Sequence, residues 1–163
     1  MSQPVRHFDE IVAFLDAADL TDITVYEERA RRIMRSEDDG QVPGPSVAMA
    51  VNVSENEVRY RFRMVLADDT SEYVADIETL YVVPEADVVE VTVELQQEFA
   101  QRVAYMAAYP FLRASIFGGA SRLGTARPVL GLARQDEFEP GEKMTQDEIA
   151  ATFFDNRSEL DSP

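Results

Sequence analysis

Few residues of this chain have the type and spacing that catalysis needs. His7 is the sole histidine, and no serine, cysteine or third ligand stands at a useful spacing from it, so we interpret it as a solvated or packed side chain. The acidic pairs Asp38–Asp39 and Asp68–Asp69 supply oxygen ligands of the kind calcium prefers, but they lack the ligand spacing of a calcium loop. We interpret both pairs as turn residues and predict no metal site, no cofactor and no catalysis.

Gly118 and Gly119 are the other pair with a chemical interpretation, because glycine-rich turns bind phosphate. No lysine follows them and they lie within a helical pattern, so they do not match a phosphate loop. Each costs about 1 kcal/mol relative to alanine in a helix. We therefore predict that they permit close packing against another helix or a strand, and that Gly124 ends the helix.

The composition indicates one globular domain. Of the 163 residues, 45% are hydrophobic, which is enough to bury a core, and the formal net charge is −16. That charge repels nucleic acid and favours solubility or basic partners. The chain contains no cysteine, which excludes a disulfide framework. With no apolar run near the ~18 residues of a membrane span and no secretory pattern at the start, we expect a cytoplasmic protein with no membrane partner.

Four segments alternate between apolar and polar residues, and they predict the strands of an antiparallel sheet. These are residues 22–34, 47–53, 58–66 and 73–83, with a glycine- and proline-rich crossover at 36–45 after the first. Short turns fix the register of the last three, pairing Val53 with Val58, Val51 with Tyr60, Met49 with Phe62, Phe62 with Ile77 and Met64 with Ala75. Arg61 then faces Glu78, and Arg63 faces Asp76, so we predict a charged face with cross-strand ion pairs.

Helical patterns surround this sheet. We predict a short helix over residues 5–18, a long helix over 85–108 that ends or kinks near Tyr109 because Pro110 follows it, and a second helix from Pro110 to about Arg122. The β-branched run at 88–93 is a poor helix former, so the alternative for the first turns of the long helix is extended backbone. Strands followed by helices indicate an α+β fold with the helices on one sheet face. We divide the chain into one domain, residues 1–135, and an acidic tail, residues 136–163, in which 145–154 have the capping pattern of a short helix.

The aromatic residues of the helical region admit two interpretations. Either they pack on the sheet as core, or they line a binding surface between helix and loop. One small sheet face has to accommodate the apolar sides of several helices. The apolar helix surface that this face cannot cover favours a binding protein or an oligomer. These residues are Phe99, Tyr105, Tyr109, Phe111 and Phe117.

The order of elements and one segment resemble the SecB family of export chaperones and its SecB-like relatives attached to toxin–antitoxin systems. The segment holds a Tyr-Pro-aromatic step, an arginine, an isoleucine, a Ser-Arg pair and a Pro-x-Leu-x-Leu run: Tyr109–Phe111, Arg113, Ile116, Ser121–Arg122 and Pro128–Leu132. The resemblance spans roughly Phe8 to Leu132. It implies a four-stranded antiparallel sheet with a crossover after the first strand, two C-terminal helices and a dimer of dimers without catalysis.

The resemblance also implies a function and a site. Family members hold unfolded chains in apolar grooves without ATP, between the long helix and the crossover loop. Carried onto this sequence, the client-binding residues are Val42, Pro45, Phe99, Val103, Met106, Tyr109 and Phe111. The expected partners are unfolded polypeptide or an antitoxin-like client.

Two departures and two alternatives accompany this prediction. The Pro-Val-Asn-Phe step common in SecB is replaced by GLARQDEFEP, and the outer sheet face mixes arginines with acidic residues, which disfavours docking to the translocase motor of protein export. We therefore favour a holdase, either general or with a dedicated client. One alternative is an interaction or structural subunit, associated with an antitoxin or a mobile element, that binds one partner. The other, a small-molecule binder or enzyme, lacks convergent polar groups.

Overall fold

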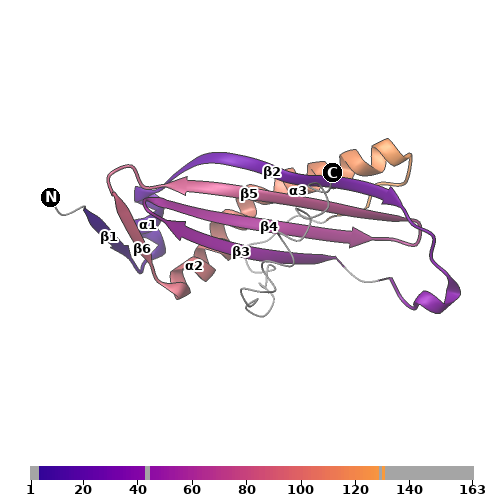
Figure 1. Ribbon diagram of the computed structural model, residues 1–163, viewed down its shortest axis with the longest axis horizontal. Coiled ribbons are helices and arrows are strands. Elements are labelled where there is room, and N and C mark those ends of the chain that lie inside the picture. Colours follow the sequence, from indigo (N-terminus) through magenta and orange to yellow (C-terminus); the bar gives the residue numbers. More distant parts are fainter. Residues whose placement is uncertain (1–3, 43–44, 129, 131–163) are drawn as a thin grey trace, which may run out of the picture.

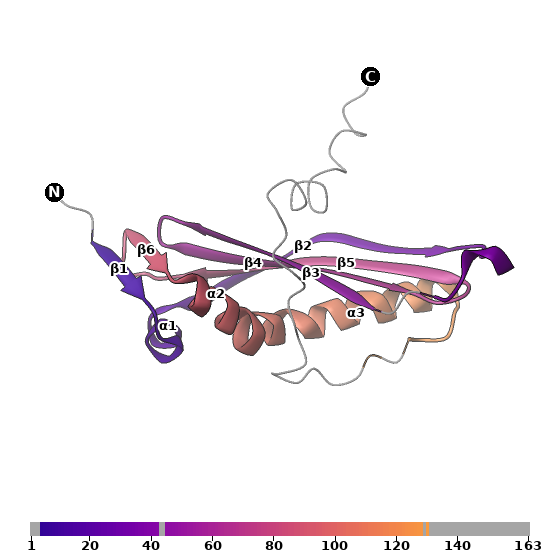
Figure 2. The same ribbon diagram turned by 90° about the horizontal axis from the view of Figure 1, so that it is seen from below.

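A four-stranded antiparallel sheet with a helical layer on one face dominates the computed structural model, which describes residues 4–42, 45–128 and Leu130 (Figures 1 and 2). The strands lie in the order β2 (Asp19–Arg32), β5 (Ser71–Val82), β4 (Glu57–Ala67) and β3 (Ser46–Ser54). The crossover from β2 to β3 contains a short 3₁₀ turn, η1 (Glu37–Asp39). The predicted α+β class, the meander of the last three strands and the crossover after the first strand are confirmed.

The predicted register of the last three strands is also confirmed. Met49 pairs with Phe62, which pairs with Ile77 on its other side, and the remaining predicted pairs follow in step. Glu55, in the turn between β3 and β4, has a φ of 53°, a left-handed conformation that a tight hairpin turn requires. Every second residue of β4 and β5 thus points to the helical side, where the side chains from Val58 to Met64 and from Tyr73 to Tyr81 are buried.

One continuous helical layer covers this apolar face, where two helices were predicted. It consists of α2 (Val93–Phe99), a π-helical segment η2 (Ala100–Ala104) and α3 (Tyr105–Leu123), and Pro110 lies inside α3. The predicted end of the helix near Tyr109 is wrong, because α3 continues through Pro110. Leu112 and Ile116, beyond the proline, are as buried as Phe99 before it, and packing on one sheet outweighs the ~3 kcal/mol that an internal proline costs.

The helix predicted over residues 5–18 is wrong, whereas the extended alternative for the start of the long helix is confirmed. Residues 5–18 form a strand, β1 (Val5–Phe8), and a two-turn helix, α1 (Ile11–Ala17), instead of one helix. The β-branched residues after Pro84 form β6 (Val88–Val91), which pairs with β1 in parallel. The long helix therefore begins at Val93, where the Thr92 side chain accepts a hydrogen bond from the Leu95 N–H. The proposed tail helix at 145–154 lies outside the described residues.

Gly119 marks the closest approach between α3 and the sheet, as predicted for the glycine pair. A β-carbon at Gly119 would stand 2.8 Å from the Ala30 Cβ on β2, and one at Gly118 would meet only the flexible end of Arg122, at 3.4 Å. Gly124 has a φ of 66° and ends the helix in a left-handed conformation.

Gly119→Ala is expected to destabilise the fold by about 1–3 kcal/mol, because Ala30 moves only with its backbone. Gly118→Ala is the matched control and is expected to stabilise by up to about 1 kcal/mol through helix propensity. Urea denaturation of both variants checks this. Equal unfolding midpoints would contradict the close packing.

Buried tyrosines tie the stability of this core to pH. Burial raises the pKa of Tyr60, and it raises the pKa of Tyr81 and of Tyr105 to about 12. In the unfolded chain these phenols ionise near pH 10, so the unfolded state loses protons first as the pH rises.

We expect full stability below pH 10 and a progressive loss above it. The loss reaches roughly 2–3 kcal/mol by pH 12 for each of Tyr81 and Tyr105. Circular dichroism and tyrosinate absorbance, followed together, measure it. Tyr81→Phe should make the decline shallower, and ionisation of all tyrosines near pH 10 in a folded protein would refute the prediction.

Candidate functional site

The residues first considered for chemistry have structural partners. The His7 Nδ1 lies 2.7 Å from a carboxylate oxygen of Glu90, on the exposed strand pair β1–β6. The Asp39 carboxylate accepts a hydrogen bond from the Ser36 N–H, and the Asp68 carboxylate accepts bonds from the Thr70 and Ser71 N–H groups. Within the part of the chain that the structure describes, no three histidine, cysteine or acidic residues cluster as a metal site would require.

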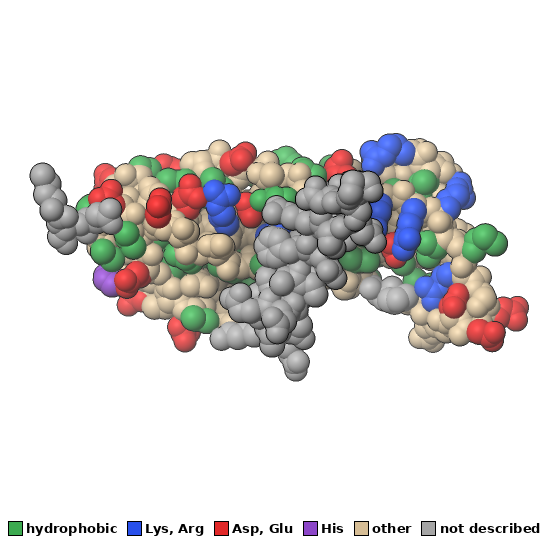
Figure 3. Space-filling model, viewed as in Figure 1, with side chains coloured by type: hydrophobic (Ala, Val, Ile, Leu, Met, Phe, Trp, Pro, Cys, Tyr) green, Lys and Arg blue, Asp and Glu red, His purple; other side chains and the backbone are tan. Residues whose placement is uncertain are grey.

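The sheet face opposite α3, here called the outer face, is the predicted charged face, and acidic and basic side chains are interspersed on the parts of it that Figure 3 shows. Cross-strand ion pairs form on it. The backbone register is the predicted one, but the side chains of β4 reach diagonally rather than straight across. Arg61 donates, at 2.8 and 2.9 Å, to both carboxylate oxygens of Asp76, which lies diagonally from it on β5. Arg59 takes Glu78 as its partner, at 3.0 Å.

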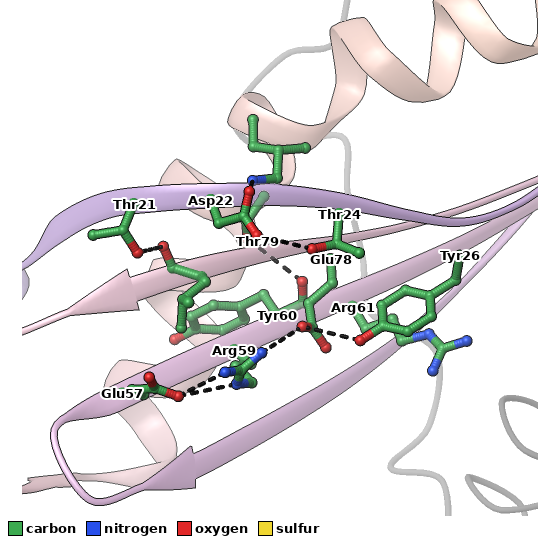
Figure 4. Close-up of polar contacts among 12 residues, drawn as sticks. Thr21, Asp22, Thr24, Tyr26, Glu57, Arg59, Tyr60, Arg61, Glu78 and Thr79 are labelled. Atoms are coloured by element: carbon green, nitrogen blue, oxygen red, sulfur yellow. Dashed lines mark hydrogen bonds and ion pairs between the residues drawn. The ribbon is translucent and has the colours of Figure 1, made fainter.

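This network extends across β2, β5 and β4. Arg63 bridges Asp76, at 3.1 Å, and Glu27 of β2, at 2.6 Å. Figure 4 shows the neighbouring cluster, in which the Tyr26 hydroxyl donates to Glu78, at 3.3 Å, beside Arg59. The Arg61 guanidinium also stacks over the Tyr26 ring, with its carbon 4.0 Å from the ring centroid. The outer face is thus a self-paired surface whose carboxylates are engaged by arginines of the same sheet.

The other side of the sheet carries an apolar surface that the helical layer covers only in part. α3 packs on β5 and β2 and to a smaller extent on β4. The inward side chains of β3 beyond it are half-buried, whereas the corresponding side chains of β4 are buried. We call this the α3–β3 surface, and its strand residues are Val47, Met49, Val51 and Val53.

The nearer flank of α3 contributes the helical part of that surface. Ser115 donates to Glu28 of β2, so this side of α3 faces the β2 edge. At 3.6 residues per turn, Met106, Tyr109 and Phe117 fall on the opposite flank, toward β4 and β3, and all three are half-buried. The Tyr109 ring also packs on Tyr105, which contacts Phe62 of β4.

The predicted client-binding residues are only partly brought together. Val42 is half-buried and Pro45 is exposed, just ahead of β3, while Val103 is half-buried on η2. Phe99 is only 1% exposed and belongs to the core beneath the surface. Phe111 is 45% exposed, and its helical position places it away from the flank of Met106 and Tyr109.

Sequence reasoning missed the contribution of β3. Its apolar alternation was recognised, but period two alone does not tell a covered strand from a partly covered one. The signal that could have identified it was the position of β3 at the end of the meander, because an edge strand lies farthest from a single covering helix.

The described residues contain no helix that is both long and apolar enough to span a membrane.

Comparisons with known proteins agree with this architecture. No family model matches the chain. A curated relative, the SecB-like chaperone SmegB of Mycolicibacterium smegmatis, is 31% identical over 143 residues, covering 88% of this chain and 94% of the relative.

Two solved structures share the fold. The Mycobacterium tuberculosis Rv1957 SecB-like chaperone, in complex with a ChAD peptide from the Rv1956 HigA1 antitoxin, aligns with a TM-score of 0.59 at 17% identity. That alignment covers 74% of this chain and 90% of that one. A protein of unknown function from Streptococcus agalactiae aligns with a TM-score of 0.55 at 9% identity, over 71% of this chain and 97% of that one. Both show likeness of fold alone, whereas the identity to SmegB extends along most of both chains; this chain belongs to the SecB-like chaperone family.

Proposed function

We propose that the protein is an ATP-independent holdase, which binds unfolded or partly folded polypeptide on its α3–β3 surface. The observation that carries the proposal is the row of half-buried apolar side chains on β3, an edge strand that α3 leaves partly uncovered because α3 packs mainly on β5 and β2. An apolar surface of this kind, on a chain with a net charge of −16, binds apolar segments while charge keeps the protein dispersed.

The geometry favours an extended client. β3 presents a row of inward side chains along nine residues, and the crossover residues Val42 and Pro45 stand at its start. An extended segment lying along this row exposes alternate side chains to the surface. Binding of that kind uses spaced apolar contacts and tolerates many sequences.

A dedicated client of the antitoxin type is the more specific form of the proposal. The support is the fold neighbour Rv1957, whose structure holds a peptide from an antitoxin. The outer face supports a dedicated client rather than docking to a translocase motor. Its carboxylates Asp76 and Glu78 are already paired with Arg61 and Arg59, so few free carboxylates remain for such docking. We further propose a cytoplasmic homotetramer, a dimer of dimers, which light scattering after size-exclusion chromatography tests.

Aggregation of a chemically unfolded protein, followed by light scattering, tests the function. The proposal predicts suppression at a molar excess of the chaperone with no nucleotide present. Unchanged aggregation, together with tight binding to a single folded partner, would instead favour a dedicated interaction subunit.

A further inference from the structure

Three arginines lie around the C-terminal end of α3, at the end of the molecule where β2 also ends (Figures 1 and 2). Arg32, the last residue of β2, donates to the Leu123 carbonyl oxygen, at 2.8 Å. Arg122 comes directly before Leu123, Arg127 follows Leu123 by four positions, and all three arginines are exposed. Basic side chains gather at this end of the molecule in Figure 3. We call these three residues the arginine cluster.

The arginine cluster has no carboxylate partner within the described residues. Arg32 donates to a main-chain oxygen, and no ion pair or side-chain hydrogen bond joins Arg122 or Arg127 to another described residue. The carbonyl ends of α3 account for Arg32, because a cation there offsets the partial negative charge of a helix C-terminus. Seven arginines elsewhere in the described residues contact carboxylates: Arg6, Arg29, Arg31, Arg59, Arg61, Arg63 and Arg102.

The carboxylates on the adjoining part of the fold have partners of their own. Glu28 of β2 accepts a hydrogen bond from Ser115, and Glu72 of β5 accepts one from Arg31. The Asp39 carboxylate accepts a hydrogen bond from a main-chain N–H of its own turn. An anion that neutralises the arginine cluster therefore has to come from another part of the chain or from another molecule.

The chain carries such an anion in its acidic tail, residues 136–163. The tail contains nine acidic and two basic residues, so it contributes −7 to the net charge of −16. The described chain leads directly to it, since Leu130 is 9% exposed and packs in the core. Asp136 follows Arg127 by nine positions, which span at most about 30 Å. Single exposed ion pairs are weak, but a tether this short gives the tail a high effective concentration at the cluster.

We propose that the arginine cluster is the docking site of the chain's own acidic tail, residues 136–163. The proposal does not depend on the holdase function. Both partners are exposed charges, so docking weakens as salt shortens the screening length from about 10 Å at 0.1 M to about 3 Å at 1 M. An acidic segment of another protein competes with the tail for the same arginines.

A nitroxide label beside the cluster tests the proposal in the full-length protein. The chain contains no cysteine, so Ser121→Cys, at an exposed position next to Arg122, provides a single attachment site. Near 0.1 M salt the label should reduce the amide signals of residues 136–148 by roughly half or more, and in about 1 M salt these signals should recover. Signals that the label leaves unchanged at the lower salt concentration overturn the proposal.

Two double variants of the labelled protein locate the docking site. Arg122→Gln/Arg127→Gln removes two charges of the cluster and should restore the tail signals at the lower salt concentration. Arg29→Gln/Arg31→Gln is the matched control, because it removes the same charge from exposed arginines that already contact Glu72, and it should leave the tail signals reduced. Equal recovery in both variants would mean that the tail responds to net charge alone, which overturns the proposal.

A mixed sample identifies the chain that supplies the tail. Isotope-labelled protein without the nitroxide is combined with unlabelled protein that carries it. Docking within one chain predicts that the tail signals keep their intensity in this mixture. Signals reduced as strongly as in the singly labelled protein would place the tail of a second copy on the cluster and overturn the proposal.

Discussion

Replacing Asp76 by alanine is expected to lower the free energy of unfolding by about 3–5 kcal/mol, because the change removes one member of a buried ionic network. The Asp76 side chain is fully buried, and it accepts two hydrogen bonds from Arg61 and one from Arg63. Both arginine side chains are only 13% exposed. Without the carboxylate, two nearly buried guanidinium groups lose their shared counter-charge.

Urea denaturation of Asp76→Ala and of a matched control measures this effect. The control is Glu72→Ala, which breaks pairs with Arg31 and Arg29, at 2.9 and 3.6 Å. Those arginines are about half exposed, so the control should cost less than about 1 kcal/mol. Similar losses in the two variants would show that the outer face is an ordinary solvated surface.

Met106→Glu is expected to weaken binding of unfolded polypeptide by at least about tenfold, which corresponds to about 1.4 kcal/mol. Met106 is half-buried and lies on the flank of α3 opposite Ser115, away from the β2 edge. A carboxylate there must lose water when an apolar client segment covers it, at a cost that the methionine does not carry. The fold should survive, since glutamate is a good helix former and the position is not in the core.

Two variants on the same helix locate the effect. Ala114→Glu, at an exposed position on the far side of α3, should leave binding within a factor of about two. Phe111→Glu tests the sequence-based expectation that Phe111 contributes, and a loss there would extend the binding surface to the second flank. Equal binding by Met106→Glu and the unmodified protein would remove α3 from the proposed surface. Titration of a fluorescently labelled unfolded polypeptide provides the measurement.

The meander of β3, β4 and β5 could be predicted almost completely from the sequence, whereas the pairing of β2 with β5 was not predicted. Alternation is a local signal, and a one-residue slip would place Phe62 or Ile77 on the charged face, so each register is specified by many side chains at once. The same argument predicted that Arg61 and Arg63 lie near Asp76 and Glu78. It did not predict which carboxylate each arginine takes, because long side chains reach diagonal neighbours as readily as directly opposite ones.

The helical layer and the N-terminal segment were predicted less well because their structure depends on distant partners. Pro110 has a local cost, but the burial of Leu112 and Ile116 on the sheet decides that the helix continues. Val5–Phe8 forms a strand because Val88–Val91 lies beside it, some eighty positions away, and no local pattern indicates that pairing.

The sequence indicated that the candidate site is an apolar surface, but it identified only some of the residues that form that surface. The sequence indicated an apolar surplus around Met106 and Tyr109, and both lie on the α3–β3 surface. Phe99 has the same helical spacing, yet it is part of the core, because periodicity identifies a helical face without telling how deeply each residue is buried. The placement of Phe111 depends on the uninterrupted course of α3 through Pro110.

The central claim is that this protein binds polypeptide in its unfolded form, and isothermal titration calorimetry without nucleotide tests it most directly. The titrants are reduced, carboxymethylated ribonuclease A and the same protein in its native, disulfide-bonded form. The account predicts saturable binding of the unfolded form, with a negative heat-capacity change from burial of apolar surface, and no binding of the native form. Absence of binding to the unfolded form, or equal binding of both, would contradict it.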